Sequence, residues 1–261
     1  MNTRLSKRAK EGNLEDRISS LPKNVLDNIL DFLPVQDAAR ASILSRKWRY
    51  VLAEYPQLVL DEHFSSAIRQ NRLPVEFTDD YPHTVNIILL QHFGPIRKIV
   101  LDLPELQSAR TTHVDQWILF LSRKGVRELT LNDSSRGHCR IPSCIFSFHE
   151  LEYLRMTKCV LRTPTAIGSF SKLTHLFLSK ITFEPSFLRM PQLLIFSMKN
   201  CTGIRLLHVF APLLQHLALF DNDDLRLDYY IICKDLAYTY VALSNAIQQC
   251  RFCAFFGDLG D

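Results

Sequence analysis

A short apolar pattern recurs from residue 96 onward, and it restricts the possible folds more than any other feature of the sequence. Each unit has apolar residues at its positions 1, 4 and 6, and often a further one at position 9. Six units begin at residues 96, 126, 151, 173, 193 and 214, so their starts lie 30, 25, 22, 20 and 21 residues apart. One such unit is too small to bury its own apolar side chains, whereas stacked units share one continuous core. The pattern therefore predicts a solenoid.

The unit resembles the leucine-rich repeat, L-x-x-L-x-L-x-x-N/C, whose period is usually about 20 to 29 residues. That resemblance implies a strand over positions 3 to 7, then a loop and a return segment with a second apolar anchor. The first interval is longer, so we expect an inserted helix there. Cys159 and Cys201 occupy position 9 and are expected to be buried loop residues that satisfy the turn backbone. The expected anchors are Leu161, Phe183, Ile204 and Leu225.

The strands of these units should present one side-chain face to solvent. Positions 4 and 6 point into the core and positions 3, 5 and 7 point outward, because side chains alternate between the two faces of a strand. Aromatic and apolar side chains stand beside cations at several outward positions, as they do at interface hot spots. The alternative is that neighbouring loops cover them or that they are merely exposed. The candidates for binding a target protein are Tyr153, Arg155, Phe177, Ile195, Lys199 and Phe220.

The stretch 21–48, LPKNVLDNILDFLPVQDAARASILSRKW, has more apolar side chains than so short a unit can bury by itself. A first helix is predicted between Pro22 and Pro34, and two further short helices should follow, the last of them bearing Trp48. An apolar stripe runs along the first helix, so part of it must face another body. The stripe consists of Val25, Leu26, Ile29, Leu30 and Leu33.

This stretch, with Leu-Pro at its start, Leu-Pro after the first helix and Trp-Arg near its end, resembles the F-box. The resemblance implies a Skp-type adaptor as partner, which links F-box proteins to a cullin-based ubiquitin ligase. From the stripe alone, an ordinary helical hairpin packed on its own domain is an equal alternative. The adaptor contacts that the resemblance implies are Leu21, Pro22, Val25, Ile29, Leu30, Leu33, Pro34 and Trp48.

The repeat region is similar to one kind of F-box protein, the plant F-box proteins with leucine-rich repeats. The phrases that carry this similarity are TVNIILLQHFGPIRKIVLDL at 84–103, VDQWILFLSRKGVRELTL at 114–131 and IPSCIFSFHELEYLRMTKC at 141–159. With the F-box, the resemblance covers most of residues 17–225. Many members of that group carry a further C-terminal domain, often called FBD, and the sequence after residue 228 departs from that pattern.

The expected organisation has five parts along the chain. Residues 1–16 form a flexible basic tail, and 17–55 form the F-box. Residues 56–95 are a linker and solenoid entry, because Pro56, Pro74 and Pro82 should interrupt regular elements there. Residues 96–228 form the repeats. Residues 229–261 are an atypical end, in which a short helix is expected over 236–249.

Charge and cysteine content favour an intracellular protein. Lys and Arg exceed Asp and Glu by only 31 − 27 = 4, too few to indicate nucleic acid or an anionic membrane as partner. The first residues lack the apolar core of a signal peptide, and the apolar runs elsewhere are too short to cross a membrane. Seven cysteines, an odd number, fit reduced thiols better than a disulfide framework. We expect a soluble protein of the nucleus or cytoplasm.

The sequence contains no recognisable catalytic motif. It has no G-x-S-x-G, H-E-x-x-H, P-loop or dinucleotide fingerprint. Cys250 and Cys253 lack a second pair, and His138 with Cys139 and Cys144 lacks zinc-ligand spacing. We therefore expect no metal, cofactor or enzyme activity.

The sequence as a whole suggests an adaptor subunit that brings a target close to a ligase, so that effective concentration is its mechanism. Three alternatives stay open. The chain could be a repeat scaffold whose F-box-like helices only cap the solenoid. It could be a truncated or regulatory product that binds the adaptor but has lost part of its target site. It could also be a hydrolase with dispersed catalytic residues, which no motif supports.

Overall fold

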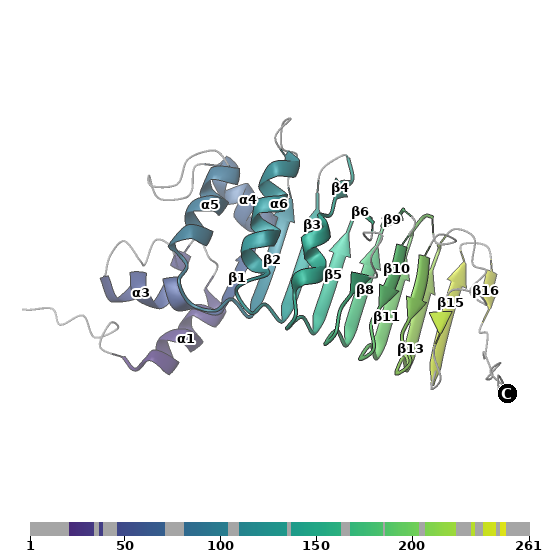
Figure 1. The fold of residues 1–261 in the computed structure, drawn as a ribbon. Helices are drawn as coiled ribbons and strands as arrows, with labels where there is room; N and C mark the ends of the chain where they lie inside the picture. The colour runs from purple at the N-terminus through teal and green to yellow at the C-terminus, as the bar shows by residue number, and fades with distance from the viewer. Residues whose placement is uncertain are drawn as a thin grey trace, which may run out of the picture.

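A few helices at the N-terminus are followed by a curved solenoid of parallel strands in the computed structural model (Figure 1). The structure describes residues 21–33, 37–38, 46–70, 81–103, 110–134, 137–162, 168–184, 186–203, 207–222, 231–232, 237–243 and 246–248. The expectations for the tail at 1–16, for Pro34 and for Pro74 fall outside these residues. The fold class predicted from the sequence is confirmed.

The N-terminal helices form a small core of their own. Helix α1 (Lys23–Phe32) packs against α3 (Arg46–Glu54), and Asp37 and Ala38 between them are also helical. The apolar residues lie four apart on α1 and three to four apart on and just after α3, so each helix turns one side inward. The core residues are Leu26, Leu30, Ala38, Trp48, Val51 and Tyr55.

A nine-stranded sheet runs the length of the solenoid, and its strands are parallel except for the last. The six strands expected from the repeats each begin at position 3 of their unit, as predicted. In spatial order the strands are β1 (Gln57–Leu60), β2 (Lys98–Leu103), β3 (Glu128–Asp133), β5 (Tyr153–Thr157), β8 (His175–Ser179), β11 (Ile195–Lys199), β13 (His216–Phe220), β15 (Tyr238–Leu243) and β16 (Ala246–Gln248).

Burial along these strands follows the predicted alternation. Every residue at position 4 or 6 of the six units is at most 5% exposed. The backbone ladder is equally regular, because the carbonyl at position 2 of one unit accepts two amide protons from the next unit. The carbonyl of Glu152, for example, accepts from Thr174 and His175 at 2.9 and 3.0 Å. Each unit is therefore held in register by its neighbour.

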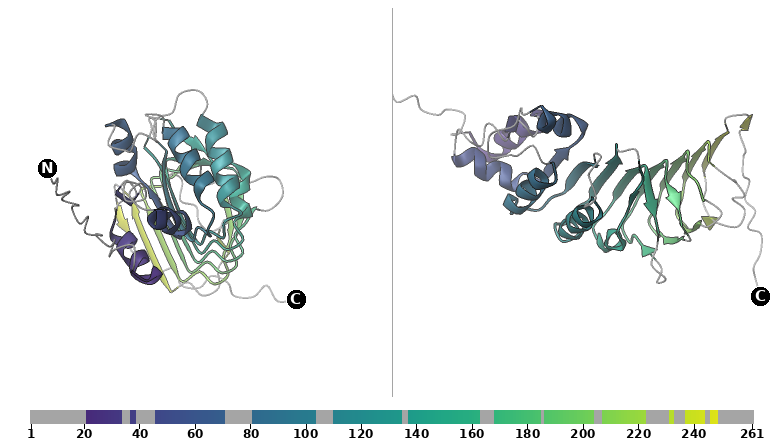
Figure 2. Two further views of the ribbon diagram at one scale, coloured as in Figure 1. Left: turned by 90° about the vertical axis from the view of Figure 1, so that its left-hand side faces the viewer. Right: turned by 90° about the horizontal axis from the view of Figure 1, so that it is seen from above.

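The return segments change from helices to strands along the solenoid. Helices α4 (Glu62–Arg69), α5 (Tyr81–Gln91), α6 (Arg110–Leu121) and the 3-10 helix η1 (Ser143–Ser147) belong to its first part (Figure 2). Helix α6 is the insertion expected in the first interval. Two small parallel sheets serve the later part: β4 (Cys139–Arg140), β6 (Cys159–Leu161) and β9 (Thr182–Phe183), and then β7 (Gly168–Ser169), β10 (Ser186–Arg189), β12 (Leu207–Phe210) and β14 (Ile231–Ile232).

Two of the predicted anchors lie in the described part of the chain. Leu161 is 1% exposed and Phe183 is 2% exposed, so both are buried in the main core as expected. Ile204 and Leu225 lie outside the described residues.

The solenoid begins earlier than the repeat pattern predicted. Strand β1 pairs in parallel with β2, and Leu58 and Leu60 are buried in the main core. Pro82 lies in the first turn of α5, where a proline is tolerated, and does not interrupt a regular element. The segment 56–95, expected to be a linker and solenoid entry interrupted by prolines, contains the first strand and two helices of the stack.

The end of the described chain also differs from the expectation. No short helix forms over the described part of 236–249. Strand β15 continues the parallel sheet from β13, and β16 turns back to pair with β15 in the antiparallel direction. The C-terminal end thus adds one further unit and a hairpin to the sheet.

The turns after four consecutive strands share one backbone conformation. Position 8 is in the left-handed region in Lys158, Lys180, Asn200 and Asp221, with φ between 48° and 57°. The thiol of Cys201 at position 9 lies 3.5 Å from the carbonyl of Lys199, and the thiol of Cys159 lies 3.3 Å from that of Thr157. Both cysteines are fully buried, so the expected role in satisfying the turn backbone is confirmed.

The helical unit is joined to the solenoid through backbone hydrogen bonds. The amides of Phe93 and Gly94 donate to the carbonyl of Ala53 at the end of α3, at 3.1 and 3.3 Å. The carbonyl of Pro56 accepts from the amide of Arg97 at 2.8 Å. We call these contacts between 53–56 and 92–98 the joint.

Candidate protein-interaction surfaces

Helix α1 presents a partly exposed apolar side away from the helical core. Two of the predicted adaptor contacts, Leu30 and Trp48, are only 3% and 8% exposed and pack inside the helical unit. Pro22 is exposed. Three others are partly buried and pack against that core: Leu21, Ile29 and Leu33. Val25 is also partly buried.

Phe32 is the most exposed large apolar side chain described, at 89%, and the sequence interpretation missed it. It follows Val25 by seven residues and Ile29 by three, so all three lie on the same side of α1. That spacing was a usable signal in the sequence, but the predicted stripe centred on Leu26 and Leu30, which turned inward. We call Val25, Ile29 and Phe32 the adaptor face.

More exposed apolar side chains lie beside the joint. The rings of Tyr50 on α3 and Phe93 are 6.5 Å apart and nearly perpendicular, and both are more than half exposed. Leu90 on α5 is 79% exposed. Sequence patterns could not identify these residues, because they come from two elements that only the fold brings together.

The outward side of the nine-stranded sheet is the second candidate surface, and we call it the open face. It is not open along its whole length. Asp102, at outward position 7 of the first unit, is only 2% exposed and accepts a hydrogen bond from the Ser134 hydroxyl at 3.1 Å. Tyr81 donates its hydroxyl proton to the carbonyl of Asp102, and burial raises the pKa of Tyr81 well above its ordinary value. The carboxyl end of β2 is therefore covered.

Three of the predicted target-binding residues contact one another at the centre of the open face. The Arg155 guanidinium lies over the Phe177 ring, 4.8 Å from its centroid, and the Tyr153 and Phe177 rings are 5.3 Å apart. The Nε–H of Arg155 donates to the Tyr153 hydroxyl at 2.9 Å. His175 stacks beside both rings. We call Tyr153, Arg155 and Phe177 the arginine cluster.

The other three predicted residues lie further along the open face. Ile195 is half-buried in register between His175 and His216, and Lys199 is exposed in register with Phe220. The Phe220 ring is 5.2 Å from that of Tyr240. None of these three touches the arginine cluster through a ring or ion contact among the described residues.

The last strands add aromatic residues that the sequence interpretation missed. Tyr238 is 67% exposed and stacks on His216 with ring centroids 4.9 Å apart, and Tyr240 is 43% exposed. They escaped notice because Thr239, between them, stands in register at position 4, where the repeat pattern requires an apolar residue. The open face thus continues one strand beyond the predicted repeats.

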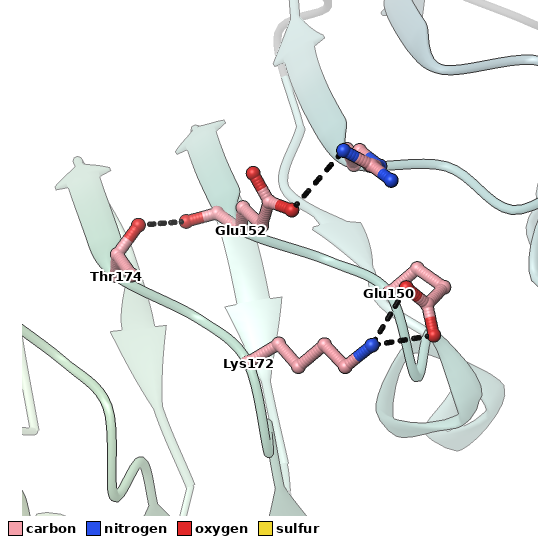
Figure 3. A network of polar contacts seen from close by, with 5 residues as sticks. Glu150, Glu152, Lys172 and Thr174 are labelled. Atoms are coloured by element: carbon pink, nitrogen blue, oxygen red, sulfur yellow. Dashed lines mark hydrogen bonds and ion pairs between the residues drawn. The ribbon is translucent and has the colours of Figure 1, made fainter.

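Charges at the amino ends of the strands are paired within the molecule (Figure 3). The Lys172 ammonium lies 2.8 Å from both carboxylate oxygens of Glu150, and this contact lowers the pKa of Glu150. Arg127 and Glu152 form a longer ion pair at 3.7 Å. Thr174 donates its hydroxyl proton to the Glu152 carbonyl at 2.9 Å. Arg127 and Lys172 at this border of the open face therefore each have a carboxylate partner.

Neither surface has the composition of a metal centre. In the parts of the chain that the structure describes, no three His, Cys, Asp or Glu side chains lie together in a way that could hold a metal ion. Within the same described ranges, no helix is both long enough and apolar enough to span a membrane. Burial raises the pKa of the Cys144 thiol, which disfavours its nucleophilic thiolate form.

Two family models match the chain in the regions just described. The F-box domain model matches residues 18–55, and the model described as FBD-associated F-box protein At5g56370, LRR repeats, matches residues 114–234. The first region contains α1 and α3, and the second contains the strands from β3 to β14. No solved structure matches the chain.

Similar curated proteins come from Arabidopsis thaliana. The F-box/FBD/LRR-repeat protein At1g13570 is 34% identical over 88% of this chain and 50% of its own length. The F-box/LRR-repeat protein At2g42720 is 38% identical over 54% of this chain and 32% of its own length. The F-box/LRR-repeat protein At3g26922 is 26% identical over 90% of this chain and 78% of its own length. The chain spans about a third to a half of the first two relatives.

Proposed function

This chain is an F-box protein with plant-type leucine-rich repeats, and from that premise we propose that it is the substrate-recognition subunit of a Skp-cullin-F-box ubiquitin ligase. In this proposal the F-box binds a Skp-type adaptor, the adaptor binds a cullin, and the repeats bind a target protein. The chain itself performs no chemistry. It raises the local concentration of the target at the ligase.

The observation that carries the proposal is the adaptor face. Phe32, 89% exposed at the end of a short helix, has an apolar ring whose contact with water is unfavourable. A partner that covered the ring would remove this cost. Val25 and Ile29 extend the same side of α1, and Leu21 and Leu33 border it. The helical unit is stabilised by its own core of Leu26, Leu30 and Trp48, so these outer residues are free to contact another protein. Leu30 and Trp48 then support the face from beneath.

The open face supports the other half of the proposal. The arginine cluster combines two aromatic rings and a guanidinium, the residue types that contribute most to protein interfaces. It lies on regular strands, so its geometry is fixed before a target arrives. A preorganised surface loses less conformational entropy on binding.

One alternative, in which the helices only cap the solenoid, has an observation in its favour. The joint satisfies backbone carbonyls at and just after the end of α3, and it attaches the helices to the first end of the stack. A cap alone, however, gives no reason for the exposed side of α1, which faces away from that core. The two functions are compatible, and only adaptor binding distinguishes them.

The test is co-purification of the full chain with a Skp-type adaptor. Wild-type protein should retain the adaptor, and Phe32→Asp should weaken retention by about tenfold or more, because a charge would enter an apolar contact. Leu30→Arg is less suitable, since Leu30 is buried and its replacement would unfold the helical unit.

Asn24→Asp is the matched control. Asn24 is an exposed residue of α1 outside the adaptor face, about a quarter-turn around the helix and about 12 Å along its axis from Phe32. The same charge change there should leave adaptor retention nearly unaltered. Circular dichroism should report equal helix content in all three proteins. Failure of the wild type to bind any Skp-type adaptor, or undiminished binding by Phe32→Asp, would contradict the proposal.

A further inference from the structure

Lysines line the border of the open face at the carboxyl ends of three neighbouring strands. Lys199 is the last residue of β11, and Lys158 and Lys180 directly follow β5 and β8. Lys180 and Lys199 are exposed, and Lys158 is half-buried. Neighbouring strands lie about 4.8 Å apart, so the three Cα atoms fall within a span of about 10 Å. We call these three lysines the basic border.

The basic border differs from the opposite border in how its charges are paired. Among the described residues, no carboxylate lies within ion-pair distance of these lysines or of Arg155, whereas Arg127 and Lys172 at the amino ends are paired. The outward positions of β5, β8, β11 and β13 contain no acidic residue. Asp221, after β13, marks the end of the basic stretch.

The backbone at two of these lysines is unusual for the residue type. Lys158 and Lys180 have φ values of 57° and 54°, in the left-handed region that Asn and Asp adopt more readily than Lys. Asn200 and Asp221 occupy the same position in the next two units and have the same conformation. The turn therefore does not require lysine. The presence of lysine at two of these turns points to a role for its charged side chain.

The guanidinium of Arg155 is held in an orientation that suits binding of an anion near this border. It is stacked on Phe177 and bonded through Nε to the Tyr153 hydroxyl, which fixes the plane of the group. A guanidinium held in this way can receive a carboxylate with its remaining N–H groups in a two-bond arrangement. Thr157 and Ser179, at position 7 between Arg155 and the lysines, add hydroxyl groups on the same face.

We infer that the segment of the target bound on the open face is acidic, with one carboxylate on Arg155 and further Asp or Glu side chains along the basic border. This inference rests on the proposed function and specifies the partner of its target-binding half. Apolar side chains of the same segment contact the rings of Phe177 and Phe220. The complementarity of charge gives the segment its orientation, because its carboxylates meet the basic border on one side of the face.

The experiment selects short random peptides by phage display on the full chain and compares their composition. Wild type should enrich Asp and Glu. One selected peptide and its Asn/Gln counterpart are then measured by fluorescence anisotropy at salt concentrations of about 0.05 and 0.5 M. The acidic peptide should bind more tightly, and high salt should weaken it, because exposed ion pairs are screened.

The decisive variant is the double substitution Lys158→Asn and Lys180→Asn. Asparagine already occupies this turn at Asn200, so the thermal melting temperature should be unchanged or slightly higher. Affinity for the acidic peptide should fall roughly five- to thirtyfold, as expected for two lost charge contacts. The matched control, Arg97→Asn with Lys172→Asn, removes the same charge at the amino ends of the strands and should keep the affinity.

The outcomes separate this inference from the function on which it rests. Neutral or basic peptides that bind the face and are lost in Arg155→Ala would overturn the acidic segment while target capture survives. If the wild type selects no peptide that Arg155→Ala does not also select, the inference is overturned and target capture loses its support. Adaptor binding would be unaffected by that result. Lysine-dependent binding of a poly-uridine oligonucleotide, with no acidic peptide selected, would overturn the inference in favour of a nucleic-acid partner.

Discussion

Adjacent residues of β8 show how one strand serves both the fold and the surface. Leu176 at position 4 is 1% exposed in the main core, whereas Phe177 at position 5 lies half-buried on the open face. Their side chains leave the same backbone in opposite directions because strand residues alternate. A one-residue error of register would exchange their roles.

Replacement of these two residues by alanine should therefore have unequal effects on stability. Leu176→Ala should reduce the free energy of unfolding by about 2 to 5 kcal/mol, because it leaves a cavity in the core. Phe177→Ala should reduce it by less than about 1.5 kcal/mol, since only its ring and cation contacts are lost. Urea unfolding of both variants checks this, and equal losses would contradict the assigned register.

The imidazole of His92 is a buried titratable group at the joint. Its Nε2–H donates to the Tyr55 carbonyl at 2.8 Å, and its buried Nδ1 has no hydrogen-bond partner among the described residues. Burial lowers the pKa of His92 and outweighs the opposing effect of the hydrogen bond to the Tyr55 carbonyl, and the nearby Lys124 ammonium adds to the lowering. The folded protein therefore favours the neutral ring, and the unfolded chain binds the proton more readily.

Stability should accordingly fall as the pH drops below about 6.5, the ordinary histidine pKa, because protonation favours the unfolded chain there. His92→Gln keeps a hydrogen-bond donor but cannot titrate, so its urea midpoint should decrease less between pH 7.5 and pH 5.5 than that of the wild type. His138→Gln, a change at an exposed position, is the control. An identical acid response in the wild type and His92→Gln would refute this role.

At the scale of elements, the joint depends on a close backbone approach. A Cβ added to Gly94 would lie 2.9 Å from both the Cα and the carbonyl oxygen of Glu54, and neither backbone atom can move aside without shifting α3. Gly94 thus allows the end of α3 to lie directly against the solenoid. Glycine is needed at this position because there is no room for a Cβ atom.

Gly94→Ala should consequently destabilise the protein by about 1 to 3 kcal/mol through overpacking at the joint. The two cores are separate clusters, so each should persist, and urea unfolding should separate into two transitions. Gly137→Ala is the matched control, because nothing lies within 4 Å of a Cβ at that position. Retention of a single unshifted transition in Gly94→Ala would show that the joint tolerates displacement.

Strands and helices were predictable where the pattern of buried residues within a single unit determines them. Period-two alternation fixed the start of all six repeat strands, since burying positions 4 and 6 leaves no other register. The unit of strand β1 has the same spacing, with Tyr55, Leu58 and Leu60 at positions 1, 4 and 6. It was not recognised as a repeat because helices and a stretch with two prolines follow it. Strand β15 was missed because Thr239 breaks the apolar pattern, and parallel pairing with β13 forms it anyway.

At the scale of the whole molecule, the candidate surfaces were predictable only in part. Tyr153, Arg155 and Phe177 could be selected by position, and the fold brings them together because equal positions of stacked units are neighbours. The basic border depends on φ at the turns, which no apolar pattern reports. Tyr50 and Phe93 meet only because α3 and the solenoid share the joint.

The joint also bears on which sites of a target would be modified. Because backbone hydrogen bonds fix α3 to the solenoid, the adaptor face and the open face keep one mutual orientation. Under the proposed function, a bound target would turn the same side toward the ligase at every encounter, so position, more than local sequence, would select the lysines that receive ubiquitin. Mass spectrometry of a ubiquitinated target should then find few sites with wild type and a wider set with Gly94→Ala, and identical sets would exclude this role for the joint.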